Sequence, residues 1–463
     1  MKKLFLVPGI GGSQLIDESH GTDFNMPPPR SIWNPSHLDY RFEFKPVNLL
    51  HDWVFFADLF QLPKSTPLTE GLPAKLKYTT AIAQWPDPKQ SVDHTASVIV
   101  VPYDFRRPNA ESADWLDKVV KAYAGSDDEV TILAHSMGGL VATYWFAALG
   151  GWEHCNRLIT LGTPFGGAPK ALEWLIRHSG LLLRWPNLQK TLHGWPSMYE
   201  LLPCYSMVEH MLEGKPTWIK PVEIPVAEEP FLGFYDNAQK GYAFHTSLDE
   251  ALRNVPEEQL HNRLAIMGTH HSTTSSAYLE NGNFTFFDTS PLWSDVEVTN
   301  LLGGDGTVPL YAADPLFADS HTRELVPGVR HAALWSKSAL GAAYGFFTPM
   351  KTAYRGSEKD TSAYHVDMVV PEEIRVGEPV NVRVTIHSDD TLPSGIPATL
   401  FVGLPHAVDQ SIPLERVDGE PEYRGVFTPE KAGVVTIGTT ISVNQCQYSD
   451  KFDIPVLDDE ELE

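Results

Sequence analysis

Residues 129–140, EVTILAHSMGGL, decide the fold of this chain. Residues 130–133 form a short apolar run rich in β-branched side chains, which is typical of a buried parallel strand. Residues 140–149 have the composition of a largely buried helix, and Gly150 and Gly151 follow to end it. The stretch therefore predicts a strand, a tight turn and a helix, with Ser136 in the turn.

The turn around Ser136 is similar to the G-x-S-x-G motif, in which a sharp strand-to-helix turn holds a serine hydroxyl above the edge of a sheet. Small residues are needed two positions before and two positions after the serine, because the strand and the helix pass close together there. Ala134 and Gly138 occupy these positions, so alanine replaces the first glycine. The positive end of the helix would also favour an anion beside Ser136. We therefore expect a serine nucleophile; a chance match is the alternative.

Length and composition favour a globular protein with more than one part. A chain of 463 residues with 42% hydrophobic and 20% charged residues suits two domains, or one domain enlarged by insertions. The net charge of −24 argues against binding to nucleic acid and against strong attraction to anionic membranes. Cys155, Cys204 and Cys446 lie far apart without metal-site spacing, which predicts free thiols in a reducing compartment.

The N-terminal sequence MKKLFLVPGIGG carries two lysines and an apolar run, as signal peptides do. The run covers only residues 4–7 before Pro8 and Gly9, so we expect no signal peptide. No stretch approaches the roughly 18 apolar residues that a membrane-spanning helix needs. A cytoplasmic protein is predicted.

Glycines also surround the loop that follows the first expected strand, in the sequence PGIGGS at residues 8–13. Such glycines let backbone N–H groups approach a ligand closely. In an α/β-hydrolase, one oxyanion-hole N–H comes from the residue after the nucleophile and another from an early strand-to-helix loop. Met137 and Ile10 would supply them. A dinucleotide-binding loop is excluded because the G-x-G-x-x-G spacing is absent.

Candidates for the base and the acid follow Ser136 in the chain. His331 lies in PGVRHAALW, after a predicted last strand, and Asp305 lies in LLGGDGTVPL, 26 residues before it. The order serine, acid, histidine is that of α/β-hydrolases. Taken singly, Asp305 could be a turn residue and His331 a surface residue. Asp288 is a reserve acid.

Other titratable residues fit the mechanism less well. His270 and His271 precede Asp305, and Asp104 precedes the serine, so their order is wrong. His135 adjoins Ser136, and we expect its side chain to be directed elsewhere. No cluster of metal ligands can be assembled from the sequence, so neither metal nor cofactor is expected.

Two long segments interrupt the α/β alternation and are rich in aromatic residues and proline: residues 14–96 and 171–261. They are too long for simple connections, so we interpret them as insertions that form a cap and a lid over the site. Ordinary peripheral structure is the alternative.

The sequence pattern changes after residue 354. The polar stretch 351–364 is typical of a linker. Residues 380–386 then alternate between apolar and polar, and further strand-like runs follow. An Ig-like all-β sandwich is predicted for residues 364–457, with an acidic tail at 458–463. We expect no catalytic residues there, and a role in docking a protein partner.

Seven motifs, in chain order, carry a resemblance to a known family: LVPGIGGS, PYDFRR, AHSMGG, LGTPFGGAP, WPSMYELLP, GGDGTVP and VRH. Over about residues 3–340 the chain resembles the lecithin:cholesterol acyltransferase family, which includes the lysosomal phospholipase/transacylase and phospholipid:diacylglycerol acyltransferases. The resemblance implies an α/β-hydrolase domain at 1–355 with cap and lid insertions. It also implies Ser136 as nucleophile, Asp305 as acid, His331 as base, and Trp33 in SIWNP as an aromatic contact near the acyl site.

The predicted function is that of a serine-dependent hydrolase or O-acyltransferase of lipid acyl esters, with peripheral membrane contact through the cap. The signal peptide and disulfides of the secreted family members are absent, which argues against work on extracellular lipoproteins. Two alternatives stay open: an esterase for small soluble esters, and an adaptor with an inactive hydrolase fold.

Overall fold

The structure of the chain is a computed structural model. The structure describes residues 2–10, 12, 14–17, 40–43, 76–77, 98–177, 189, 192–212, 214–288, 303–315, 323–335, 337–342, 364–370, 374–388, 398–403, 410–417, 421–431, 433–443 and 446–457.

A six-stranded sheet forms the centre of the N-terminal part, in the order β13-β10-β7-β6-β1-β5. Every pairing between neighbouring strands in this sheet is parallel, which confirms the predicted α/β class. Strands β1, β5, β6 and β10 are almost entirely buried, as is typical of strands in a parallel sheet, whereas the edge strand β13 is mostly exposed. Their bounds are β1 (Lys2–Val7), β5 (Val98–Val100), β6 (Glu129–His135), β7 (Cys155–Leu161), β10 (Arg263–Thr269) and β13 (Arg323–Pro327).

The helix predicted after Ser136 starts earlier than the sequence indicated. Helix α3 (Met137–Ala148) begins directly after Ser136 rather than at residue 140, and α2 (Asn109–Tyr123) begins after Pro108. The long helix α7 packs on α3, where Tyr144 and Phe244 stack with ring centroids 5.5 Å apart. The other helices are α4 (Pro169–Ile176), α6 (Pro196–Glu200), α7 (Phe234–Arg253), α8 (Glu257–Leu260), α10 (Leu310–Ala313) and α11 (Lys337–Ala342).

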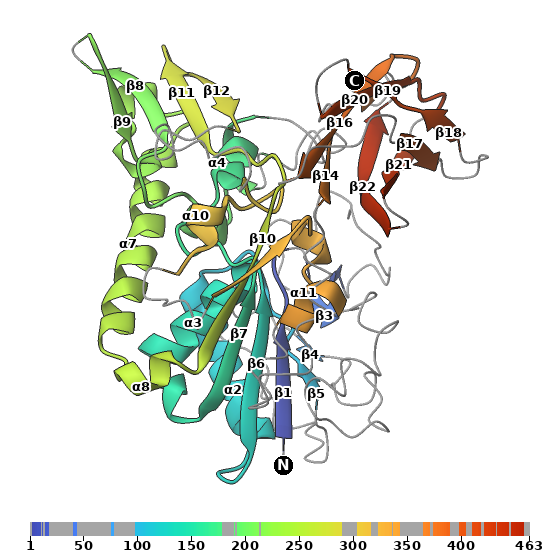
Figure 1. The fold of residues 1–463 in the computed structure, drawn as a ribbon. Coiled ribbons are helices and arrows are strands. Elements are labelled where there is room, and N and C mark those ends of the chain that lie inside the picture. The colour runs from blue at the N-terminus through green and yellow to red at the C-terminus, as the bar shows by residue number, and fades with distance from the viewer. Residues whose placement is uncertain are drawn as a thin grey trace.

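A second sheet, in the order β12-β11-β8-β9, lies at the end of the molecule to which the strands of the central sheet run (Figure 1). Its strands β8 (Val208–Leu212) and β9 (Lys215–Ile219) come from the insertion predicted at 171–261. Strands β11 (Ser276–Glu280) and β12 (Asn283–Phe287) come after it. The other predicted insertion, at residues 14–96, is described only at three strands, which pair in one sheet. These strands are β2 (Gln14–Asp17), β3 (Tyr40–Glu43) and β4 (Leu76–Lys77).

Two further sheets occupy the C-terminal part, in the orders β14-β16-β20-β19 and β15-β22-β21-β17-β18. One apolar core joins them, with Val384 and Met368 from the first sheet and Leu400 and Ile437 from the second. The Ig-like classification and the boundaries at 355, 364 and 457 stay predictions. The strands are β14 (Tyr364–Val369), β15 (Ile374–Arg375), β16 (Val380–Ser388), β17 (Ala398–Gly403), β18 (Gln410–Pro413), β19 (Glu415–Arg416), β20 (Glu422–Phe427), β21 (Gly433–Val443) and β22 (Cys446–Leu457).

Within the described ranges, no helix is both long enough and apolar enough to cross a membrane.

Candidate active site

Ser136 lies in a strained turn between β6 and α3. Its backbone angles are φ 55° and ψ −130°, a combination that costs a non-glycine residue about 1–3 kcal/mol. The backbone N–H of Ser136 donates to the carbonyl oxygen of Leu161 at 2.8 Å, which ties the turn to the end of β7. The strain is thus held by the sheet, and it places the serine side chain at the carboxyl end of β6.

Close backbone contacts explain the small residues around this turn. A Cβ atom on Gly138 would lie 2.2 Å from the carbonyl oxygen of Pro8, and one on Gly139 would lie 2.7 Å from Cβ of Thr163. A Cβ on Gly9 would lie 2.8 Å from Cβ of Ser136. Helix α3 therefore starts in contact with the loop after β1. Ala134 is fully buried within β6, so its single methyl group is accommodated.

Hydrogen bonds join Ser136 to His331 and His331 to Asp305. The Ser136 Oγ is 2.8 Å from Nε2 of His331, and Nδ1 of His331 is 2.7 Å from Oδ2 of Asp305. A carboxylate at Nδ1 favours the tautomer with the proton on Nδ1, which leaves Nε2 to accept the serine proton. The structure thus brings together the three residues that the sequence analysis predicted as nucleophile (Ser136), base (His331) and acid (Asp305).

Asp305 is held by its own turn. Its Oδ1 accepts hydrogen bonds from the backbone N–H groups of Thr307 at 2.9 Å and Val308 at 2.8 Å, which leaves Oδ2 for His331. Its carbonyl oxygen accepts from the backbone N–H of His331 at 2.8 Å. Asp305 is 1% exposed, so the carboxylate is oriented by the protein rather than by solvent.

His135 lies against His331, although we expected its side chain to be directed elsewhere. Its Nε2 donates to the carbonyl oxygen of His331 at 2.9 Å, and the two ring centroids are 4.8 Å apart. Burial is the main cause that lowers the pKa of His135 to about 3, and the neighbouring His331 contributes to this lowering. His135 is therefore neutral at pH 7 and helps to hold His331 in place.

The loop of Ile10 reaches the turn of Ser136 through Gly9, and Met137 is the first residue of α3. The buried hydroxyl of Tyr103 donates to the carbonyl oxygen of Pro8 at 2.9 Å and so supports this loop from the PYDFRR motif. In the same motif, Asp104 is buried and forms a two-point ion pair with Arg106, at 2.6 and 2.7 Å. The sequence contained this motif but gave no sign of which contacts it makes.

The remaining candidates lie away from this hydrogen-bonded line or outside the described residues. Asp288 is exposed and accepts a hydrogen bond from Ser272 at 2.7 Å, so it does not contact His331 as a reserve acid would. His270 Nδ1 is 2.7 Å from the hydroxyl of Thr269. The predicted acyl-site contact Trp33 lies outside the described residues.

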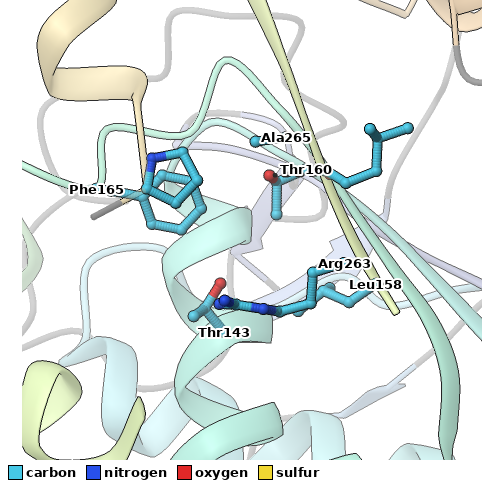
Figure 2. Close-up of a pocket in the computed structure, with 8 residues that line it drawn as sticks. Thr143, Leu158, Thr160, Phe165, Arg263 and Ala265 are labelled. Carbon is cyan, nitrogen blue, oxygen red and sulfur yellow. Dashed lines mark hydrogen bonds between the residues drawn. The ribbon is translucent and has the colours of Figure 1, made fainter. Parts of the chain in front are cut away.

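Among the residues that the structure describes, no group of three or more His, Cys, Asp or Glu side chains could hold a metal ion. A small cavity lies between α3 and strands β7 and β10, where Thr143, Thr160 and Arg263 converge (Figure 2). Its volume of about 10 Å³ is near the minimum for one water molecule, so it cannot hold an acyl chain. Burial lowers the pKa of Arg263 there to about 10.

Comparison with known proteins supports the resemblance seen in the motifs. Residues 89–218 match the family model described as lecithin:cholesterol acyltransferase. Over these residues the chain is similar to that family. The matched segment contains Ser136 and ends before Asp305 and His331. The comparison with curated proteins gave no match.

Similarity to solved structures is weak. The Bacillus licheniformis lipase BlEst2 in its mature form is 14% identical, with 57% of this chain and 82% of that chain covered and a TM-score of 0.27. The propeptide form of the same lipase is 12% identical, with 79% and 88% covered and a TM-score of 0.26. A conjugative transposon lipoprotein from Bacteroides eggerthii is 13% identical, with 20% and 96% covered and a TM-score of 0.15. TM-scores this low carry no argument about fold or function.

Proposed function

We propose that this chain is a serine-dependent hydrolase or O-acyltransferase of lipid acyl esters. The observation that carries the proposal is the continuous hydrogen-bonded line Ser136–His331–Asp305, which starts from a serine in a strained strand-to-helix turn. A serine hydroxyl becomes a useful nucleophile only when a base removes its proton and an acid orients that base. The relation to the lecithin:cholesterol acyltransferase family supports an acyl ester of a lipid as substrate.

In the proposed reaction, the Ser136 oxygen attacks the ester carbonyl carbon while His331 Nε2 takes the hydroxyl proton. Asp305 keeps the other ring nitrogen protonated and stabilises the charged imidazolium. When the tetrahedral intermediate collapses, the C–O bond to the alcohol breaks and His331 returns the proton to the departing oxygen. An acyl-enzyme on Ser136 remains, and water or an acceptor alcohol then attacks it by the reverse sequence of proton transfers.

Negative charge on the carbonyl oxygen needs two hydrogen-bond donors, for which we propose the backbone N–H groups of Ile10 and Met137. Loss of one such donor typically costs about 10²–10³ in kcat. The Tyr103–Pro8 hydrogen bond would keep the Ile10 loop in position during this step.

An exposed apolar hairpin supports a lipid surface as the place of action. Met211 and Leu212, at the turn between β8 and β9, are 46% and 40% exposed, and Trp218 on β9 is 37% exposed. Phe287 on the same sheet is 44% exposed. This sheet lies beyond the carboxyl ends of the central strands (Figure 1), and Ser136 directly follows one of these strands, β6. Such side chains can enter the interface of a neutral bilayer, which the acidic net charge does not oppose.

The proposal is tested by measuring kcat/KM for soluble esters of increasing acyl chain length. Each CH₂ group buried in an acyl site contributes about 0.8 kcal/mol, so kcat/KM is expected to rise steeply from two-carbon to eight-carbon p-nitrophenyl esters. Ser136→Ala should abolish hydrolysis at every length. If kcat/KM is highest for the acetate ester, the alternative of an esterase for small soluble esters is favoured. If the folded wild-type protein hydrolyses neither these esters nor phospholipid vesicles, the alternative of an adaptor with an inactive hydrolase fold is favoured.

A further inference from the structure

One strand of the C-terminal sheets reaches the loops that carry Asp305 and His331. Strand β14 bears Asp367, which is 6% exposed. The Asp367 Oδ1 is 3.1 Å from Nδ1 of His271, and Oδ2 accepts from the backbone N–H of Ser272 at 3.4 Å. The side chain of His271 is fully buried. A carboxylate from the C-terminal part therefore ends against a buried histidine of the hydrolase part.

His271 is the backbone neighbour of the acid turn. Its N–H donates to the carbonyl oxygen of Gly304 at 3.0 Å, and the N–H of Gly304 donates back to the carbonyl oxygen of His271 at 3.0 Å. The same residue forms a bridge with Asp305. Any shift of His271 is therefore transmitted to the turn that orients the Asp305 carboxylate.

Arg330 makes the corresponding link to the base. It directly precedes His331, and its Nη2 donates to the carbonyl oxygen of Met368 on β14 at 2.9 Å. The same nitrogen is 3.6 Å from Oδ1 of Asp367. The Arg330 guanidinium also lies against Gly306, since a Cβ atom there would be 3.2 Å from Nη1. Asp367 thus interacts with both loops, one through His271 and the other through Arg330.

We infer that Asp367 is a positioning residue for the reaction at Ser136, and that β14 clamps the acid loop and the base loop in register. This inference rests on the proposed function. Catalytic side chains must be held to about 0.5 Å, and a displacement near 1 Å can cost about 10²-fold in rate. The clamp comes from a part of the chain outside the family match at 89–218. In this inference the C-terminal sheets complete the support of the site.

The test uses the full-length chain with Asp367→Ala and Asp367→Asn, and a soluble short-chain ester. Asp367→Ala should lower kcat by about 10- to 100-fold with KM within about threefold, because substrate contacts are unchanged while the triad is misplaced. Asp367→Asn keeps an oxygen that can accept from Ser272 but loses the charge facing Arg330, so it should recover part of kcat. Glu422→Gln is the matched control, since Glu422 pairs with the exposed Arg424 in the same sheet as β14 and should leave kcat unchanged.

The rate at which Ser136 reacts with a fluorophosphonate separates this inference from the proposed function. If wild-type Ser136 takes no label, the proposed function fails. If wild-type protein is labelled and folded Asp367→Ala is labelled at the same rate, only the clamp is overturned. Should Asp367→Ala fail to fold, Asp367→Asn decides, because a folded Asn variant with wild-type kcat and labelling rate contradicts the inference.

Discussion

Single backbone contacts confine the residues beside Ser136 to the smallest side chains. A Cβ atom on Gly138 would meet the carbonyl oxygens of Pro8 and Val7 at 2.2 and 2.7 Å, and neither backbone atom can move without shifting the loop of Ile10. Gly138→Ala should therefore destabilise the fold by about 1–3 kcal/mol or displace the loop. Gly125→Ala is the control, because the nearest atom to a Cβ there is 3.7 Å away. Thermal unfolding measures the first effect, and equal midpoints for the two variants would contradict it.

At the same scale, the sequence could predict Ser136, Asp305 and His331 because each lies in a short motif and the three follow the chain order of α/β-hydrolases. His135 and Tyr103 could not be assigned, since their partners are backbone carbonyl oxygens of residues far away in the chain. The Tyr103 hydroxyl, for example, contacts Pro8 across 95 positions. The role of Asp367 could not be predicted for a similar reason. Its partners are far away in the chain and depend on the position of β14 in the fold.

Among the helices, α6 buries an acidic side chain with an altered titration. Glu200 is 7% exposed, its Oε2 accepts from the backbone N–H of Asn109 at 2.6 Å, and burial raises its pKa to about 8. Between the pKa of the unfolded chain, about 4.3, and pH 8, the carboxyl is ionised when unfolded but protonated when folded. Rising pH in this window therefore lowers the free energy of unfolding, by about 1.4 kcal/mol per pH unit from this group.

Glu200→Gln removes this titration and keeps an oxygen for Asn109. Relative to wild type, the variant should gain stability steadily from pH 5 to pH 8, as measured by urea unfolding. Glu153→Gln, which changes an exposed carboxyl, is the control. A difference between Glu200→Gln and wild type that does not vary with pH would show that Glu200 is ionised in the folded protein.

Elements with a continuous apolar pattern were predictable, and those without one were not. The buried runs of β1 and β6 identified the central sheet, and alternation identified β16. The four-stranded sheet of β8, β9, β11 and β12 was missed, because in β8, β9 and β12 exposed apolar residues such as Met211 and Phe287 obscure the alternation. The predicted cap at 14–96 lies mostly outside the described residues.

For the molecule as a whole, the exposed hairpin predicts where a lipid surface would bind. Replacing both Met211 and Leu212 by Asp should weaken binding to phosphatidylcholine vesicles by more than tenfold, because charge replaces apolar surface at the point of contact. Hydrolysis of a short soluble ester should change little. Val426→Asp is the control, since Val426 is 50% exposed on β20 in the C-terminal part. Vesicle sedimentation measures binding, and equal losses for both variants would argue against the hairpin as the membrane contact.

The reactivity of Ser136 tests the central claim most directly. Purified full-length protein would be treated with a fluorophosphonate, and the labelled peptide and the labelling rate determined by mass spectrometry. The account predicts a label on Ser136 alone, no label in Ser136→Ala, and labelling slowed by about 10³-fold or more in His331→Ala and Asp305→Asn. Labelling of another serine that persists in Ser136→Ala, or a wild-type rate in His331→Ala, would contradict a nucleophile activated by the hydrogen-bonded line from Asp305 to Ser136.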